Sequence, residues 1–115
     1  MNHNKIKLDF GKLLLEAELF ESDIANKFIE HLPYSIEITK WGNELYGSIG
    51  IDLGTNNPVP EIPEGGLAYT NQGNYFCVFF GQSPAWPVEY IGQLKGDAWK
   101  QLLNRTDLNH LSIMK

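Results

Sequence analysis

Apolar and polar side chains alternate with a period of two along most of this chain of 115 residues. A period of two is typical of β-strands that bury one face, because successive side chains of a strand point to opposite faces. Turn-forming residues such as Gly11 and Gly42 separate the alternating runs. The pattern predicts eight strands, at Lys5–Phe10, Leu13–Phe20, Ser35–Trp41, Glu44–Ile51, Leu67–Thr70, Tyr75–Phe80, Glu89–Lys95 and His110–Met114.

Two segments break this alternation and carry apolar residues at helical spacing. Ser22 has the side chain of a helix N-cap, and Pro33 ends the helix that follows it. Asp97 is interpreted as the N-cap of the second helix. The spacing predicts helices near Ser22–His31 and Asp97–Leu103. The fold expected is therefore mainly β: a closed antiparallel eight-stranded barrel with two short helices over its ends.

Length and charge limit the classes of protein to consider. A chain of this length is expected to form one domain, residues 1–115, without help from a disulfide or a metal. The net charge is −5 and Arg105 is the only arginine, so neither nucleic acid nor a membrane is expected as a partner. The start, Met1–Lys5, does not resemble a signal peptide, and no apolar stretch could span a bilayer. A cytoplasmic location is the expectation.

The segment Tyr75–Phe80 is apolar on both of its strand faces. A strand of this kind is covered on both sides. One face is therefore expected inside the barrel, and the other under a helix, a loop or a binding groove. Cys77, the one cysteine of the chain, lies in this segment and is expected to be a buried structural thiol. The segment Asp52–Gly66 holds three prolines and is expected to be a long loop.

Two groups of residues are candidates for a binding site. Trp41, Glu44 and Tyr46 flank a predicted turn, and an aromatic wall beside one carboxylate could hold a cation or a sugar. The loop Gly81–Pro87 could form the rim of a groove next to Phe79. The alternative is that both groups simply pack onto the barrel. The candidate ligand-binding residues are Trp41, Glu44, Tyr46, Tyr69, Phe79, Ser83 and Trp86. We expect the aromatic residues among them to lie close together and to be partly exposed.

Other kinds of site find no support in the sequence. The histidines His3, His31 and His110 share no metal-ligand spacing, and Cys77 has no histidine close to it in the chain. No glycine-rich segment stands between a strand and a helix as a phosphate loop does. We therefore expect no metal site, no cofactor and no catalytic residue.

Three stretches, taken in order, resemble the cyclophilins. They correspond to the opening strand and its helix, to the Ser-Met-Ala-Asn and Gln-Phe-Phe-Ile strands, and to the turn before the last helix of that family. The stretches are Gly11–Phe20 with Ala25–Phe28, Gly66–Asn71 with Tyr75–Val78, and Ile91–Gly96. Each stretch is short, but their shared order covers nearly the whole chain.

A closer resemblance is to the small prokaryotic cyclophilin-like proteins, a family of similar length whose function is mostly undefined. The elements that carry it are Leu32-Pro33, Trp41–Tyr46, Gly66–Tyr69 and Phe79–Pro84. This resemblance implies a barrel of cyclophilin-like topology. It implies no reaction.

The chain departs from the cyclophilins at the arginine of their Phe-His-Arg motif. The resemblance implies that such an arginine stabilises the twisted prolyl amide during isomerisation. The corresponding region, about Ser35–Asp52, has neither arginine nor histidine, and Lys40 is its only cation. Alternation places Lys40 on the same side as Ile36 and Ile38. Since a buried unpaired lysine is costly, Lys40 is expected to reach solvent near Gly42.

Three hypotheses about function remain open. The favoured one is a binding module that holds a small molecule or a peptide in an aromatic-lined groove and is not an efficient proline isomerase. The second is an interaction module that pairs with other copies of itself or with another chain. The third is a weak prolyl isomerase or another enzyme. The sequence does not identify the ligand.

Overall fold

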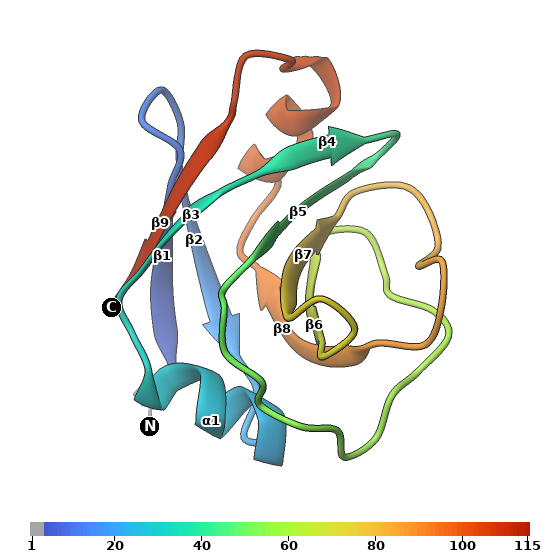
Figure 1. Ribbon diagram of the computed structural model, residues 1–115. Helices are drawn as coiled ribbons and strands as arrows, with labels where there is room; N and C mark the ends of the chain where they lie inside the picture. Colours follow the sequence, from blue (N-terminus) through green and yellow to red (C-terminus); the bar gives the residue numbers. More distant parts are fainter. Residues whose placement is uncertain (1–3) are drawn as a thin grey trace.

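The structure is a computed structural model and describes residues 4–115, so His3 and the first two residues lie outside the described part. Nine strands form one antiparallel sheet in the order β3-β9-β1-β2-β8-β6-β7-β5-β4 (Figure 1). The strands are β1 (Lys5–Asp9), β2 (Leu14–Leu19), β3 (Tyr34–Glu37), β4 (Thr39–Trp41), β5 (Glu44–Ser48), β6 (Gly66–Thr70), β7 (Tyr75–Phe79), β8 (Glu89–Leu94) and β9 (His110–Met114). The helices are α1 (Asp23–Glu30) and the 3-10 helix η1 (Ala98–Asn104).

The barrel is nearly closed, with one unsealed seam between the two ends of the sheet. The sequence predicts one strand over Ser35–Trp41, but β3 pairs with β9 whereas β4 pairs with β5. The strand is interrupted between them at Ile38, whose amide donates to the carbonyl oxygen of Asn109 at 3.1 Å. Gly47 of β5 lies so close to Glu37 that a Cβ atom would overlap its carbonyl oxygen. The predictions of eight strands and of full closure are therefore wrong at this interruption.

The alternation predicted from the sequence is confirmed in the first hairpin. Ile6 and Leu8 of β1 are buried and stand opposite the buried Ala17 and Leu15 of β2. Their polar neighbours face outward, so the pairing register follows from burial of one face. Gly11 makes the turn with a φ of +86°, a conformation that glycine adopts without steric cost.

Helix α1 covers one end of the barrel, near the position that the sequence predicts (Figure 1). The hydroxyl of Ser22 accepts a hydrogen bond from the amide of Ala25 at 3.4 Å, which confirms Ser22 as the N-cap. Ile24 and Phe28 face the barrel and are buried. The ring of Phe28 stacks on Phe76 of β7 with centroids 5.3 Å apart. The N-cap and this apolar face together hold the helix in place.

The second predicted helix is the 3-10 helix η1, and its expected cap is absent. Asp97 occupies the N-cap position, but its side chain makes no capping hydrogen bond. The first turn is instead closed by the backbone, since the amide of Lys100 donates to the carbonyl oxygen of Asp97 at 3.0 Å. Trp99 and Leu102 are buried against the barrel. Within residues 4–115, neither helix has the length and apolar character needed to cross a membrane.

Lys40 is partly exposed, but its ammonium group binds the end of η1 and does not stand free near Gly42 as expected. Its Nζ donates to the carbonyl oxygens of Leu102 at 3.1 Å and Arg105 at 3.0 Å, with that of Leu103 at 3.4 Å. Carbonyl groups at the C-terminal end of a helix lack partners within the helix and favour a cation. These carbonyl groups are distant from Lys40 in the chain, so sequence alone did not reveal them.

Two apolar clusters lie on opposite faces of β7. Phe76, Val78 and Phe80 belong to the large cluster that fills the barrel. Cys77 and Phe79 belong to a smaller cluster outside it. This division confirms that the segment is covered on both sides, and Cys77, at 3% exposure, is buried as expected.

The long loop between β5 and β6 is tied to the barrel by Glu89. The Glu89 carboxylate accepts hydrogen bonds from the amides of Asn56 at 2.9 Å and Asn57 at 3.1 Å. Further along the loop, Val59 forms a bridge with Val88. The loop predicted over Asp52–Gly66 is confirmed, apart from Gly66, which already belongs to β6.

Replacing Lys40 with Met should lower the free energy of unfolding by about 1 kcal/mol, because the η1 carbonyl groups lose their donor while the apolar stem remains. Urea unfolding measures the change. Lys100→Met is the matched control, since Lys100 lies on the exposed side of η1. Equal stability of the two variants would contradict a capping role for Lys40.

Candidate ligand-binding pocket

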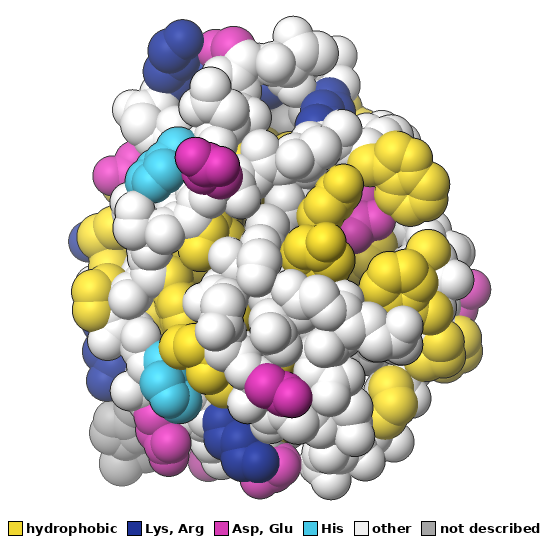
Figure 2. All heavy atoms as spheres, viewed as in Figure 1, with side chains coloured by type: hydrophobic (Ala, Val, Ile, Leu, Met, Phe, Trp, Pro, Cys, Tyr) yellow, Lys and Arg dark blue, Asp and Glu magenta, His cyan; other side chains and the backbone are white. Residues whose placement is uncertain are grey.

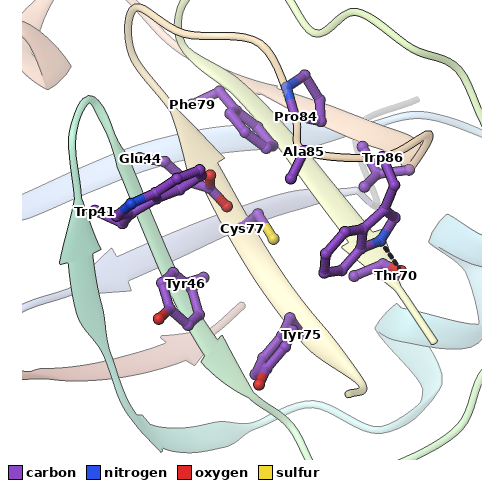
Figure 3. A pocket seen from close by; sticks show the side chains of 11 residues that line it. Trp41, Glu44, Tyr46, Thr70, Tyr75, Cys77, Phe79, Pro84, Ala85 and Trp86 are labelled. Carbon is purple, nitrogen blue, oxygen red and sulfur yellow. Dashed lines mark hydrogen bonds between the residues drawn. The ribbon is translucent and has the colours of Figure 1, made fainter. Parts of the chain in front are cut away.

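A pocket opens on the outside of the barrel, between the hairpin of β4 and β5 and the loop that connects β7 to β8 (Figure 3). Its volume is about 300 Å³, at the lower end of the range of small-molecule sites. Figure 2 shows an acidic side chain surrounded by hydrophobic ones on this face of the molecule. The lining residues are Trp41, Glu44, Tyr46, Thr70, Tyr75, Cys77, Phe79, Pro84, Ala85, Trp86 and Val88.

Aromatic side chains form the walls of the pocket. Trp41 at the end of β4 and Trp86 in the loop stand on opposite sides of it and expose 55% and 38% of their surface (Figure 3). The indole nitrogen of Trp86 donates to the hydroxyl of Thr70 at 3.0 Å, which fixes the ring. Tyr46 and Tyr75 meet edge to face with centroids 5.2 Å apart. Trp86, Tyr46 and Tyr75 are therefore held in position by contacts within the protein.

Glu44 places a carboxylate at the base of the pocket, where it is only 7% exposed. Its partners are weak donors: the amide nitrogen of Gln82 at 3.5 Å and the thiol of Cys77. None of the ion pairs formed within residues 4–115 includes Glu44. Burial raises the pKa of Glu44 above its ordinary value, and the two hydrogen bonds oppose this only in part.

The Cys77 thiol lies beside this carboxylate on the neighbouring strand. Tyr46 stands directly opposite Cys77 in the register of β5 and β7, and Glu44 stands opposite Phe79. Burial, followed by the charge of Glu44, raises the pKa of the Cys77 thiol well above its ordinary value. A thiol that stays protonated is a hydrogen-bond donor and not an activated nucleophile.

A hydrogen-bonded clip joins the two loops that flank the pocket. The side-chain oxygen of Gln82 accepts from the amide of Asn43 at 2.6 Å, and the carbonyl oxygen of Asn43 accepts from the amide of Phe80 at 2.9 Å. Gly42 has a φ of +62° and lies against Gln82 with no room for a side chain. The clip sets the distance between the two tryptophan walls.

Five of the residues singled out in the sequence meet in this pocket, and two do not. The five are Trp41, Glu44, Tyr46, Phe79 and Trp86. Phe79 is 1% exposed and belongs to the floor, so it is not partly exposed as expected. Ser83 points away from the lining, because its hydroxyl donates to the Glu61 carboxylate at 2.7 Å on the outside of the loop.

Tyr69 lies inside the barrel with 0% exposure, so its assignment to the site is corrected. In β6, Leu67 faces the interior, and the period of two places Tyr69 on the same face. Its hydroxyl donates to the carbonyl oxygen of Ile51 at 2.9 Å and accepts from the amide of Leu53 at 2.8 Å. Tyr69 therefore anchors the start of the long loop from within.

Sequence reasoning missed several of the lining residues, and for two of them the signal was present. Tyr75 and Cys77 share a strand face with Phe79, so the alternation that selected Phe79 also selects them. The other missed residues depend on the path of the loop after β7 or on cross-strand neighbours. They are Thr70, Pro84, Ala85 and Val88.

The lining combines aromatic surface with a single carboxylate. Its only side chain that is charged in the ordinary range of pH is Glu44, and it includes no lysine, arginine or histidine. Residues 4–115 contain no group of three or more His, Cys, Asp or Glu placed to hold a metal ion. The arrangement suits an apolar molecule with a hydrogen-bond donor or a positive charge facing Glu44.

Two solved structures share the fold of this chain. The hypothetical protein AF2241 from Archaeoglobus fulgidus, determined in solution, is 21% identical, with a TM-score of 0.79 over 98% of this chain and 95% of that one. McbB in complex with tryptophan is 17% identical, with a TM-score of 0.74 over 96% of this chain but only 44% of McbB. At these identities the likeness concerns the fold alone.

The sequence itself assigns the family. The chain belongs to the Cyclophilin-like family, whose sequence model matches residues 4–114. Membership confirms the resemblance seen in the separate motifs. No curated protein matches the chain in sequence.

Replacing Glu44 with Gln should stabilise the protein increasingly as pH rises through the window between the ordinary pKa of a glutamate side chain and the raised pKa of Glu44 in the folded protein. The raised pKa of Glu44 in the folded state means that the folded protein holds its proton longer than the unfolded chain does. Ionisation of Glu44 therefore lowers stability as pH rises through this window. Thermal unfolding of both proteins across the window measures the difference.

The exposed Glu37→Gln variant controls for loss of one charge in that experiment. If the difference in stability between Glu44→Gln and the natural protein stays constant with pH, the raised pKa of Glu44 is contradicted.

Proposed function

We propose that this chain is a binding module that takes a small molecule with a flat apolar body into the pocket between Trp41 and Trp86. The observation that carries the proposal is the pocket itself. Two tryptophans face each other across a preformed cavity of about 300 Å³ whose base holds a carboxylate. This volume corresponds to roughly ten water molecules, which fits a metabolite better than an extended peptide.

The loss of stability caused by burying Glu44 supports a role for this residue in binding. A carboxylate that is buried without a cation partner lowers the stability of the fold, and packing gives no reason to keep one there. Groups with a shifted pKa in a cleft are typical of functional sites. The exposed face of Trp41 adds to this argument, because a purely structural tryptophan would be buried more completely.

A structural relative supports the same class of ligand. McbB, which shares the fold, has a structure in complex with tryptophan, a molecule with a flat aromatic body. The relation is distant, so it favours a type of ligand and does not identify one for this chain.

The proposal also covers the location, the domain organisation and the partners of the protein. We place the chain in the cytoplasm as one domain, with a small molecule as its partner and with neither nucleic acid nor a membrane. A homo-oligomer that covers apolar surface is the alternative, and the exposed large apolar residues outside the pocket are Leu14, Phe20 and Leu103. A mass from light scattering separates these alternatives.

We further propose that the chain is not an efficient proline isomerase. Its pocket lining includes no cationic side chain. Lys40 is turned to the carbonyl groups of η1, and the Nε of Arg105 pairs with Asp107 at 2.9 Å. Loss of one preorganised electrostatic contact removes about 10²–10³ in rate.

Titration with indole tests the binding proposal. The indole N–H resonances of Trp41 and Trp86 should shift in two-dimensional NMR spectra, with an affinity on the order of millimolar for a fragment of this size. Trp99 is the internal control, since its N–H is bound to the carbonyl oxygen of Gly96 at the far side of the barrel wall. Shifts confined to Trp99, or none at saturating indole, would refute the proposal.

A cis–trans exchange assay on a short X-Pro peptide, with a cyclophilin as positive control, tests the proposal that the chain is not an efficient proline isomerase. We expect a rate at least about a hundredfold below that control. A rate within about tenfold of the control, lost in a Lys40→Ala variant, would make the chain an isomerase with a relocated cation.

A further inference from the structure

We propose that the pocket selects organic ammonium ions, with the positive group of the ligand against Glu44 and its apolar body between Trp41 and Trp86. This inference rests on the proposed binding function and specifies its ligand class. It commits to a free small molecule, an amine or quaternary ammonium compound with a compact apolar body.

The first argument is the charge of the lining. Glu44 is the only charged side chain among the lining residues, and its carboxylate points into the space beside Cys77 (Figure 3). The walls have low polarity, so water screens this charge less than it would on an open surface. The chain as a whole carries a net charge of −5, which also attracts cations.

The second argument is the unfilled hydrogen-bonding capacity of Glu44. An ionised carboxylate offers about four acceptor positions. The structure supplies a long bond from Gln82 at 3.5 Å and one from the thiol of Cys77. Both donors are neutral, so an ammonium group arriving from the pocket would form the first charge-assisted hydrogen bond of this carboxylate.

The third argument is the aromatic surface around the carboxylate. Trp41 lies beside Glu44, Trp86 stands across the pocket, and Tyr46 completes the near wall (Figure 3). The faces of aromatic rings carry partial negative charge and attract cations, tryptophan most strongly. The N–H of Trp86 is already bound to Thr70, which leaves its ring surface as the part available to a ligand.

The same lining disfavours anions. It offers no lysine, arginine or histidine to a carboxylate or a phosphate, and Glu44 would repel both. A free amino acid would therefore place its own carboxylate without a partner, at a cost in affinity. The pocket should prefer an amine to the amino acid with the same side chain.

Three probes with the same aromatic body differ in their polar group. They are 2-phenylethylammonium, the neutral 2-phenylethanol of equal size, and zwitterionic phenylalanine, which adds a carboxylate. Each is titrated near neutral pH at about 0.15 M salt, and the resonances of Trp41 and Trp86 give the affinity. We expect the ammonium ion to bind at least about tenfold more tightly than either other probe. In Glu44→Gln the preference for the ammonium ion over 2-phenylethanol should disappear.

The possible outcomes distinguish the two proposals. Equal binding of the ammonium ion and the alcohol in the natural protein would overturn the ammonium inference and leave the binding function standing. Absence of any effect on Trp41 and Trp86 from all three probes would overturn both. The Trp99 resonance reports whether the variant is folded.

If Glu44→Gln does not fold, the pH dependence of binding to the natural protein replaces it. The preference for the ammonium ion over the alcohol should disappear as pH falls far enough to protonate Glu44, because the ammonium ion stays charged and the neighbouring Cys77 thiol is already protonated. A preference that persists after Glu44 is protonated would place its origin outside Glu44 and overturn the assignment.

Discussion

The pocket depends on a strand that must be covered on both faces. Phe76, Val78 and Phe80 fill the barrel, and their hydrophobic burial holds β7 in the sheet. The same strand presents Cys77 and Phe79 to the outside. Because apolar area on an outer face is unfavourable in water, the chain after β7 folds back over it. That loop covers part of the face, and the part it leaves open is the pocket.

The cover is rigid because backbone and side-chain groups tie it down at separate points. Gln82 binds the turn at Asn43, Trp86 binds Thr70, and Val88 pairs with Val59 of the long loop. A site built in this way loses little conformational freedom on binding, so more of the interaction energy is available for affinity. The contacts that position the walls of the pocket are consequently all formed within the protein.

Alternation along the strands was a sound guide to the fold and to half of the site. It identified the strands, both helical segments and the face of β7 that carries Phe79. It would also have excluded Tyr69 had it been applied to β6, where Leu67 and Tyr69 share the inner face. The strand interruption at Ile38 and the partners of Lys40 depend on β9 and η1, so no local pattern predicts them.

The lining of the pocket carries one acidic side chain and no basic one. Isomerisation is helped by a donor that stabilises the amide nitrogen as it loses conjugation, which calls for a positive group in the site. Here the one cation on the corresponding strand region, Lys40, faces the interior side and binds the carbonyl groups of η1. The residue that faces the pocket nearby is Glu44, a negative group. Because β-strand side chains alternate between faces, Trp41 and Lys40 point to opposite sides of β4. The alternation of β4 thus turns Lys40 away from the pocket and leaves Glu44 as the charged residue of the lining.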